Sequence, residues 1–432
     1  MAWLLQRRTR WLTRFGIFTV LLGALFIRYG LVVPFSDGVN PSVTGIAIRP
    51  ERLFDYYVAV VMVYAGIYAG VLLVDFGWRE SKTARTGSES PTWLLAAVAG
   101  LITIAVLIAW VVVPWTDFVN GIYSLLPGHT AFSYRQHRVQ YGEDTLYSRS
   151  ALAYAGSFAR FALAPAVLWV LFFHRNRSAL LAVMFWGLLV LLLVIGVLSG
   201  QKLPALLLIA GLAVALIIQR GQPSVLNWRL AVAAAVLIFA VAPILYLVQY
   251  PALSYRDALQ LTVFRITEEY SRVAQLRFIF YPDLHPFLNG MSSYVVRGLA
   301  AVVGIHSGTT QSPETYLPAQ FPGAGSNPGT WNAGFFADAW ADFGFPGVAV
   351  ASVAVGAIVR AIDRWFAQSG RGALEMGVYT AVCMSSLWVS DVGLLTAMWT
   401  YGLASSFLIY GVLKLADISK PLSLRLMAAR SP

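Results

Sequence analysis

The chain has 432 residues, of which 58% are hydrophobic and only 12% are charged, a composition that cannot cover a water-facing surface and argues against a soluble globular protein. Its 31 basic and 20 acidic residues give a formal net charge of +11, but the basic residues are scattered between apolar runs, which argues against a nucleic-acid partner. Crossing a bilayer takes about 20 apolar residues per helix, and the sequence reaches that length repeatedly. We therefore expect an all-α, polytopic integral membrane protein.

About ten transmembrane helices are predicted, within a single membrane domain over residues 1–432. Their approximate bounds are 11–33, 56–76, 93–115, 151–173, 179–198, 203–218, 229–249, 345–363, 374–390 and 394–414. The first follows an Arg-rich N-terminus and is too long for a cleavable signal peptide, so we expect it to be retained. The single cysteine, Cys383, falls within an apolar run and is expected to pack between helices.

The basic residues predict the topology, because short cytoplasmic loops carry an excess of Lys and Arg. With both termini in the cytoplasm, most of the basic residues fall on the inner side and occur in every short inner connection. The others gather mainly in two large outer loops, 116–150 and 250–344. Basic residues on that side run against the topological rule, so we expect an anion to be bound there.

The second loop is predicted to be partly helical. An amphipathic helix is expected over Tyr255–Phe280, because Arg265, Glu269, Arg272 and Leu276 fall on one stripe. The later segment 304–329 is rich in Gly and Pro and is expected to be irregular.

Arginines of the outer loops are the strongest chemical feature. They are Arg135, Arg138, Arg149, Arg256, Arg265, Arg272, Arg277 and Arg297. A guanidinium group is always charged and binds phosphate oxygens in a bidentate manner, so this set is suited to holding a pyrophosphate at the membrane surface. Alternatively, they bind lipid headgroups or pair with Glu143, Asp144, Glu268 and Glu269.

Two further cations lie close to the bilayer. Lys202 falls in a very short outer turn, where it either snorkels to the membrane surface or contacts substrate. Arg160 lies deeper, within the fourth predicted helix, and is expected to face a polar cavity.

Soluble cofactor motifs are missing from the sequence. It contains no Walker loop, no Rossmann glycine pattern after a strand, no HExxH and no CxxC, so we expect no nucleotide, no redox cofactor and no metal. General-base candidates in the outer loop are His285, His306, Glu268, Glu269, Asp338 and Asp342.

Two segments resemble Wzy-type O-antigen polymerases. One is Gly200-Gln201-Lys202-Leu203-Pro204 followed by an apolar helix, and the other is 329–347, GTWNAGFFADAWADFGFPG. The paired outer loops and the Arg297 to Gly308 spacing are also similar to that family, although the first loop lacks this spacing. Each of six aromatic residues is expected either to stack on sugars or to belong to an interfacial belt, with both roles represented among them: Tyr316, Phe321, Trp331, Phe335, Phe336 and Trp340.

The resemblance implies a fold like that of the C-type membrane glycosyltransferases in a bacterial inner membrane, with the active site facing the periplasm. The donor and the acceptor would be glycans on undecaprenyl pyrophosphate, and a chain-length regulator protein is a possible partner. Arg265, Arg272 and Arg297 would stabilise the departing pyrophosphate, and His306 or Glu269 would act as the base. Substrate contacts are expected from Arg135, Arg138, Arg160, Lys202, Asn332 and Asp338.

Two alternatives remain at this point. A glycan ligase of the same general fold would transfer the finished polymer to lipid A core or to a protein. A transporter of polysaccharide or of a lipid-linked anion would also have many helices and basic residues, but transporters tend to show repeats and ionisable groups at the membrane midplane. Here the polar residues gather in an outer loop, which favours an enzyme.

Overall fold

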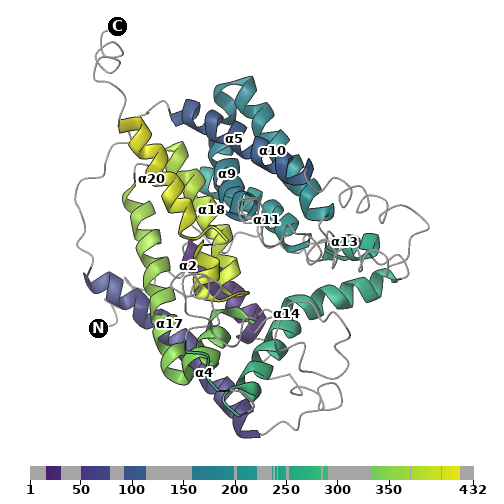
Figure 1. The fold of residues 1–432 in the computed structure, drawn as a ribbon, viewed down its shortest axis with the longest axis vertical. Helices are drawn as coiled ribbons and strands as arrows, with labels where there is room; N and C mark the ends of the chain where they lie inside the picture. The colour runs from purple at the N-terminus through teal and green to yellow at the C-terminus, as the bar shows by residue number, and fades with distance from the viewer. Residues whose placement is uncertain are drawn as a thin grey trace, which may run out of the picture.

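The computed structural model describes residues 16–30, 50–77, 92–112, 158–198, 202–220, 236, 239–240, 242–249, 253–283, 286–289, 333–369, 371–399 and 401–418 (Figure 1). Within these ranges the chain is almost entirely helical and contains no strand, which confirms the all-α class. The α-helices are α2 (Ile17–Leu25), α4 (Pro50–Gly77), α5 (Thr92–Val112), α9 (Ala164–His174), α10 (Ala179–Leu198), α11 (Lys202–Gln219), α13 (Ala242–Gln249), α14 (Tyr255–Phe280), α17 (Gly334–Gln368), α18 (Ala373–Val389), α19 (Leu394–Trp399) and α20 (Ser405–Ile418). The π-helix η1 (Phe26–Gly30) follows α2, and the π-helix η4 (Ala159–Leu163) precedes α9. The 3-10 turn η5 (Arg175–Arg177) follows α9.

Helices α4 and α17 form a closely packed pair because glycines let their backbones touch. A Cβ atom at Gly70 would lie 2.1 Å from the Val353 carbonyl oxygen, and one at Gly356 would lie 2.1 Å from the Ile67 carbonyl oxygen. Small residues at such contacts are typical of helix pairs in membranes, where close van der Waals packing drives association. The two longest apolar helices therefore pack backbone against backbone at these glycines.

Helix α18 lies between two groups of helices (Figure 1). It contacts α9 and α11 on one side and α2 and α17 on the other. Because it is enclosed, two of its hydroxyl groups bond to its own backbone: that of Thr380 donates to the Met376 carbonyl oxygen and that of Ser386 donates to the Cys383 carbonyl oxygen. Cys383 is fully buried between helices, as the sequence predicted.

Two sets of contacts define the ends of this bundle. At one end the Tyr29 hydroxyl donates to the Ser390 carbonyl oxygen at 2.9 Å, and we name it the site end. At the other end the Asp363 carboxylate accepts the backbone N–H of Ile17 at 3.0 Å and the Tyr379 hydroxyl, and we name it the basic end. Consequently α2 and α18 run from the basic end to the site end, and α17 runs the opposite way.

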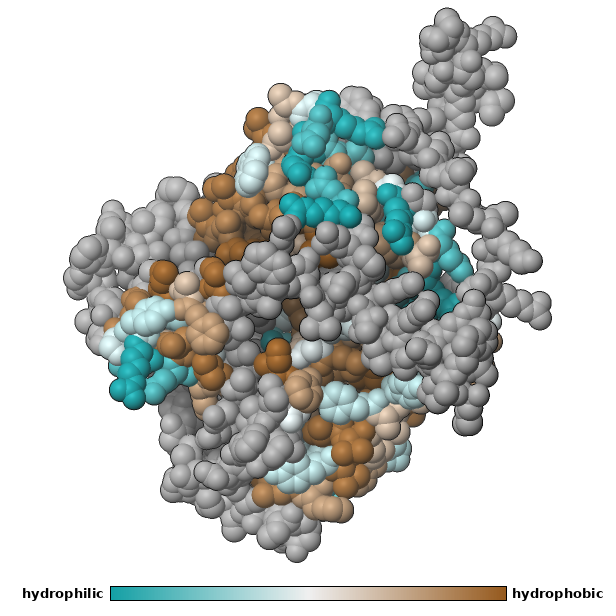
Figure 2. Space-filling model, turned by 180° about the vertical axis from the view of Figure 1, so that it is seen from behind, coloured by the Kyte–Doolittle hydropathy of each residue, from teal (hydrophilic) through white to brown (hydrophobic). Residues whose placement is uncertain are grey.

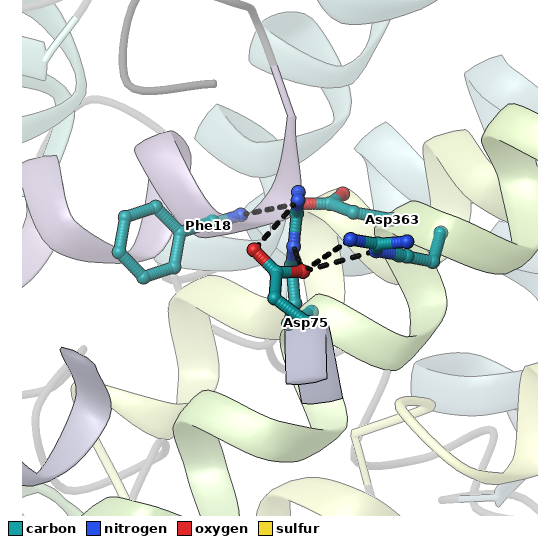
Figure 3. A network of polar contacts seen from close by, with 5 residues as sticks. Phe18, Asp75 and Asp363 are labelled. Atoms are coloured by element: carbon teal, nitrogen blue, oxygen red, sulfur yellow. Dashed lines mark hydrogen bonds and ion pairs between the residues drawn. The ribbon is translucent and has the colours of Figure 1, made fainter. Parts of the chain in front are cut away.

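The basic end takes its name from arginines that link α17 to α4. Arg360 Nε donates to Asp75 Oδ1 at 2.7 Å, and Arg364 Nε donates to the same oxygen at 3.0 Å. One helical turn separates these arginines, whereas Asp363 lies on another face and accepts the Phe18 N–H at 3.4 Å (Figure 3). Asp75 thus balances the charge of only one of the two guanidinium groups that it binds.

Large apolar side chains cover the outer faces of several helices, and Figure 2 shows this apolar surface in brown. Examples are Leu73 and Phe76 of α4, Leu101 of α5, Val183 of α10, Val350 of α17 and Val412 of α20. Exposed apolar side chains in this number are typical of a surface that contacts another protein or a membrane. Two described helices, over Leu53–Gly77 and Gly334–Gln368, are long and apolar enough to cross a bilayer, and shorter apolar helices accompany them.

Some predicted bounds differ from the structure. Helix α14 covers Tyr255–Phe280 as predicted and begins with a capping box between Ser254 and Asp257. Helix α17 begins at Gly334 instead of 345, so the end of the predicted loop 250–344 is helical. Within the predicted helix 229–249 the structure describes α13 over Ala242–Gln249 and helical backbone at 236 and 239–240, and the other residues of this range lie outside the described part of the chain.

The predicted single helix 394–414 was wrong, because α19 and α20 are separate helices. Gly402 lies between them with a φ of 95°, a conformation that favours glycine. A Cβ atom there would lie 2.9 Å from Ser385 Oγ and 3.3 Å from Ala162 Cα. The break thus depends on close approach to α18 and η4, which an apolar pattern does not reveal.

Candidate functional site

The last turns of α14 carry a buried arginine that is ion-paired with an aspartate of α17. Arg277 Nη1 contacts Asp338 Oδ1, the Arg277 side chain is fully buried, and that of Asp338 is 10% exposed. The Gly393 backbone covers the second carboxylate oxygen, since a Cβ atom there would lie 2.4 Å from Asp338 Oδ2. Losing either charge would leave the other buried without compensation, so the pair holds the end of α14 against the start of α17.

Aromatic rings pack around this pair. Phe278 stacks on Trp340 with ring centroids 4.3 Å apart, and Trp340 Nε1 donates to the Tyr281 carbonyl oxygen at 3.0 Å. Phe335 and Phe336 are each 1% exposed and Trp340 is 3% exposed. The expectation that these three residues stack on sugars or form an interfacial belt was therefore wrong, because the helix start that carries them is packed inside the bundle.

A second ion pair lies at the site end. Arg28 Nη1 is 3.7 Å from Asp391 Oδ1 and donates to Ser390 Oγ at 3.0 Å, and the two charged side chains are 12% and 2% exposed. The Gly334 N–H donates to the Asp391 carbonyl oxygen at 3.1 Å. Gly334 has a φ of 73°, and a Cβ atom there would lie 2.7 Å from the Tyr29 hydroxyl. The turn after α18 thus connects η1 with the start of α17.

A break in α17 separates the segment that bears Asp338 from the long apolar part of this helix. Gly344 has φ 62° and ψ −148°, which is not helical, and Pro346 follows it. Proline has no N–H, so the carbonyl of Asp342, four residues earlier, lacks a helical donor. The Asn289 N–H donates to that carbonyl oxygen at 3.1 Å. The chain beyond α14 therefore satisfies the backbone at the break.

Arg160 lines a cavity of about 50 Å³ that α9, α10, α11 and α18 enclose. Its side chain belongs to η4, the residue is 6% exposed, and its guanidinium carbon lies 4.8 Å from the centroid of the Phe161 ring. We expected a polar cavity, but apart from Arg160 and Ser385 the walls are apolar or aromatic. The helices around the cavity are apolar along most of their length and supply mostly apolar side chains, which explains the difference.

Of the predicted catalytic and substrate-contact residues, only Asp338 and Arg160 have side chains that the structure describes. Arg265, Glu269 and Arg272 lie within α14 and Lys202 begins α11, but the described structure does not include these four side chains. Arg135, Arg138, Arg297, His306 and Asn332 lie outside the described residues. Asp338 and Arg160 are described, and the cavity that Arg160 lines does not include Asp338.

Two residues of the site end were missed by the sequence reasoning. Arg28 and Asp391 were assigned no role, although a charge within a predicted span, or at the end of one, is costly and marks a functional or pairing position. That signal was present in the sequence, since Arg28 falls inside the predicted helix 11–33 and Asp391 directly follows 374–390.

Chemically, the site end combines two enclosed arginine–aspartate pairs with an arginine-lined cavity nearby on α18. Among the residues that the structure describes, no group of three or more His, Cys, Asp or Glu side chains is placed to hold a metal ion. The two ion pairs neutralise each other's charges within the bundle, so in this structure they hold helices together. No family model, no curated protein and no solved structure matches this chain in the comparisons.

Proposed function

We propose that this chain is a membrane polymerase that joins oligosaccharide repeat units carried on undecaprenyl pyrophosphate, at the periplasmic face of a bacterial inner membrane. The observation that carries the proposal is the buried Arg277–Asp338 pair. It joins the arginine-bearing helix of the second outer loop to 329–347, the segment that resembles Wzy-type polymerases. The helix was singled out for its arginines and the segment for its resemblance to the family. The ion pair therefore joins two parts of the chain that separate sequence features had indicated.

The proposed setting is a multi-spanning membrane protein with about ten spans and both termini in the cytoplasm. The long apolar helices, the alternating helix directions and the arginines of the basic end support it. The part of α17 over 345–368 is about 36 Å long at 1.5 Å per residue, enough to cross a bilayer by itself. The break at Gly344 then lies at the membrane face and not at its midplane, which favours surface chemistry over transport.

In the proposed reaction, a hydroxyl oxygen of the incoming lipid-linked unit attacks the anomeric carbon of the growing glycan. The bond from that carbon to the pyrophosphate breaks, the electron pair leaves with the pyrophosphate, and a base takes the hydroxyl proton. Arginines held in place before the reaction stabilise the charge that develops on the leaving group. In this proposal Arg265, Arg272 and Arg297 act on the pyrophosphate, and His306 or Glu269 takes the proton.

The test is polymerisation by purified protein supplied with a lipid pyrophosphate-linked repeat unit, with products separated on a gel. A ladder of lengths is expected from the native chain and from Arg177→Ala, whose exposed side chain lies at the opposite end of the bundle. Arg272→Ala and Arg297→Ala should give no ladder at unchanged protein level, and Lys at these positions should restore it only partly. A native chain that yields no ladder with its own repeat unit would refute the proposal.

A deletion strain separates the polymerase from a ligase of similar fold. Loss of a polymerase leaves single repeat units attached to lipid A, because ligation still occurs. Loss of a ligase leaves lipid A without any repeat unit. The first pattern is the one we expect.

A further inference from the structure

The cavity that α9, α10, α11 and α18 enclose is lined by a tryptophan whose indole N–H has no hydrogen-bond partner among the described residues. This tryptophan is Trp169, and the residue is 1% exposed. Buried donors in folded proteins are almost always satisfied, so an unsatisfied one indicates a group that the chain itself does not supply. A molecule that enters the cavity with a hydrogen-bond acceptor would satisfy this donor.

The edge of the Trp169 ring next to this N–H lies against α11. A Cβ atom at Gly211 would lie 2.3 Å from Trp169 Cζ2 and 3.0 Å from Cε2, the carbon that is bonded to Nε1. Leu207 and Leu208, about one turn before Gly211, belong to the cavity wall. Any side chain at position 211 would displace the indole ring. The glycine therefore keeps the donor edge beside the apolar wall that α11 supplies.

Apart from Arg160 and Ser385, the rest of the wall is hydrocarbon or aromatic ring. Trp388 stacks on Tyr401 with ring centroids 4.1 Å apart, and Phe161 packs edge-on against Tyr401 at 5.3 Å. Rings that hold one another are already ordered before a ligand arrives, which lowers the cost of binding. An occupant that matches this wall has an acceptor at one point and hydrocarbon over most of its remaining surface.

The size of the cavity and the nature of its wall favour an ester carbonyl over water. The volume is about 50 Å³, which exceeds that of a single water site, and the cavity is partly open. A buried water needs about two to four polar partners, which a mostly apolar wall supplies poorly. A carbonyl oxygen is satisfied by a single donor, and the acyl chain attached to it covers the apolar wall.

The position of the cavity in the bundle also fits an ester. Trp388 belongs to its wall, and the Asp391 N–H donates to the Trp388 carbonyl oxygen at 2.9 Å, so the cavity lies toward the site end. In the membrane setting proposed above, this end lies near the outer boundary of the hydrocarbon core, where lipid ester groups and the rings of Trp and Tyr gather. Exposed apolar side chains, Val190 and Val194 of α10 and Ile209 of α11, continue the apolar surface outside the cavity.

We propose that this cavity binds an acyl ester of a membrane glycerolipid. The ester carbonyl oxygen accepts the Trp169 Nε1–H, the first methylene groups of the acyl chain lie along Leu207 and Leu208, and the rest of the chain extends outward over α10 and α11. The lipid is a constituent of the bilayer and not a reactant. The proposal therefore goes beyond the proposed function: it rests on the membrane setting and requires no polymerisation.

The experiment compares two phosphatidylcholines that have the same head and the same chain length, one with ester-linked and one with ether-linked chains. The ether lipid lacks the carbonyl oxygens, so a difference in binding reports the acceptor and not the head or the hydrocarbon. Each unlabelled lipid competes with radiolabelled ester lipid for the immobilised full chain in detergent micelles. The ether lipid should compete about fivefold more weakly, the loss expected for one buried hydrogen bond.

Three variants locate the donor. Trp169→Phe keeps an aromatic ring but removes the N–H, so the two lipids should compete within about twofold of each other. Trp186→Phe is the matched control, because Trp186 lies on the exposed face of α10, and it should keep the preference of the native chain for the ester lipid. Leu207→Trp fills the cavity and should weaken binding of the ester lipid to that of the ether lipid or below.

The outcomes decide between the possible occupants. Equal competition by the two lipids in the native chain would overturn the proposal, as would an ester preference that persists in Trp169→Phe. A lack of saturable binding, the result for a cavity that holds only water, would overturn it too. If Trp169→Phe fails to fold in thermal unfolding, Leu207→Trp decides: unchanged binding overturns the proposal and a lost ester preference supports it. A native chain that prefers the ester lipid but makes no polymer would refute the polymerase and leave this proposal standing.

Discussion

Arg277 of α14 and Asp338 of α17 form an ion pair in which the arginine side chain has no exposed surface. The two residues lie far apart in the sequence, and neither was predicted to contact the other. Their pairing converts the predicted outer-loop helix from a solvated segment into part of the packed bundle. Its last turns, including Phe278, are accordingly buried.

Removing one partner of this pair should destabilise the fold strongly. We expect Arg277→Ala and Asp338→Ala each to lower the free energy of unfolding by about 3–5 kcal/mol, because each leaves a buried charge without compensation. The double variant should lose less free energy of unfolding than the two single variants lose together. The charge-reversed pair Arg277→Asp with Asp338→Arg should recover folding better than either single reversal. Thermal unfolding in detergent measures all of these, and additive effects of the single variants would contradict the pairing.

Glycines between α4 and α17 should tolerate no side chain. Gly70→Ala and Gly356→Ala are each expected to cost about 1–3 kcal/mol or more, because the added Cβ atom meets backbone at 2.1 Å and forces the helices apart. Gly187→Ala in α10 is the matched control, since no atom beyond the neighbouring backbone of its own helix lies within 4 Å of its Cβ position. It should be neutral or stabilising by up to about 1 kcal/mol. Equal melting temperatures for all three variants would refute this packing.

Asp75 should matter more than either arginine that it binds. Asp75→Asn leaves two partly buried guanidinium groups side by side and should cost about 1–3 kcal/mol. Arg364→Gln should cost less, because Arg360 still bonds both carboxylate oxygens at 2.7 and 3.1 Å. Thermal unfolding of both variants shows which substitution lowers the free energy of unfolding more. A larger effect from Arg364→Gln would show that Asp75 is not the centre of the network.

The two ends of the bundle should react with thiol reagents from opposite sides of the membrane. Cys383 is fully buried, so it can stay in place while Arg177→Cys and Asn289→Cys are introduced at exposed positions. In intact cells stripped of the outer membrane, an impermeant maleimide should label only Asn289→Cys, whereas a permeant one should label both. Labelling of Arg177→Cys by the impermeant reagent would reverse the proposed topology.

Polymerisation should survive chelation. Metal catalysis of pyrophosphate departure needs carboxylates arranged to hold the ion, and the arginines of the outer loops would repel a cation. We therefore expect full ladders from purified protein with excess EDTA and no increase when magnesium or manganese is added. Activity lost to EDTA and recovered with either metal would make Asp338 and Asp342 the first ligands to test.

The sequence alone predicted the helical class, the bounds of α14 and the burial of Cys383. These features depend on local pattern: apolar runs of spanning length, the Ser254 cap and a polar stripe each act within a few turns of helix. The same local reasoning selected Asp338 and Arg160 as candidate substrate contacts, and that role stays a prediction. Local sequence patterns could not predict which residues surround Asp338 and Arg160, because those neighbours come from distant segments of the chain.

Only the tertiary structure decided the rest. The pairing of Arg277 with Asp338, the start of α17 at Gly334 and the break between α19 and α20 depend on contacts between distant segments. Backbone conformations such as those of Gly334 and Gly402 are selected by neighbours that leave no room for a Cβ atom. Apolar periodicity identifies the helices, whereas close packing between them decides which charges meet and where a helix must break.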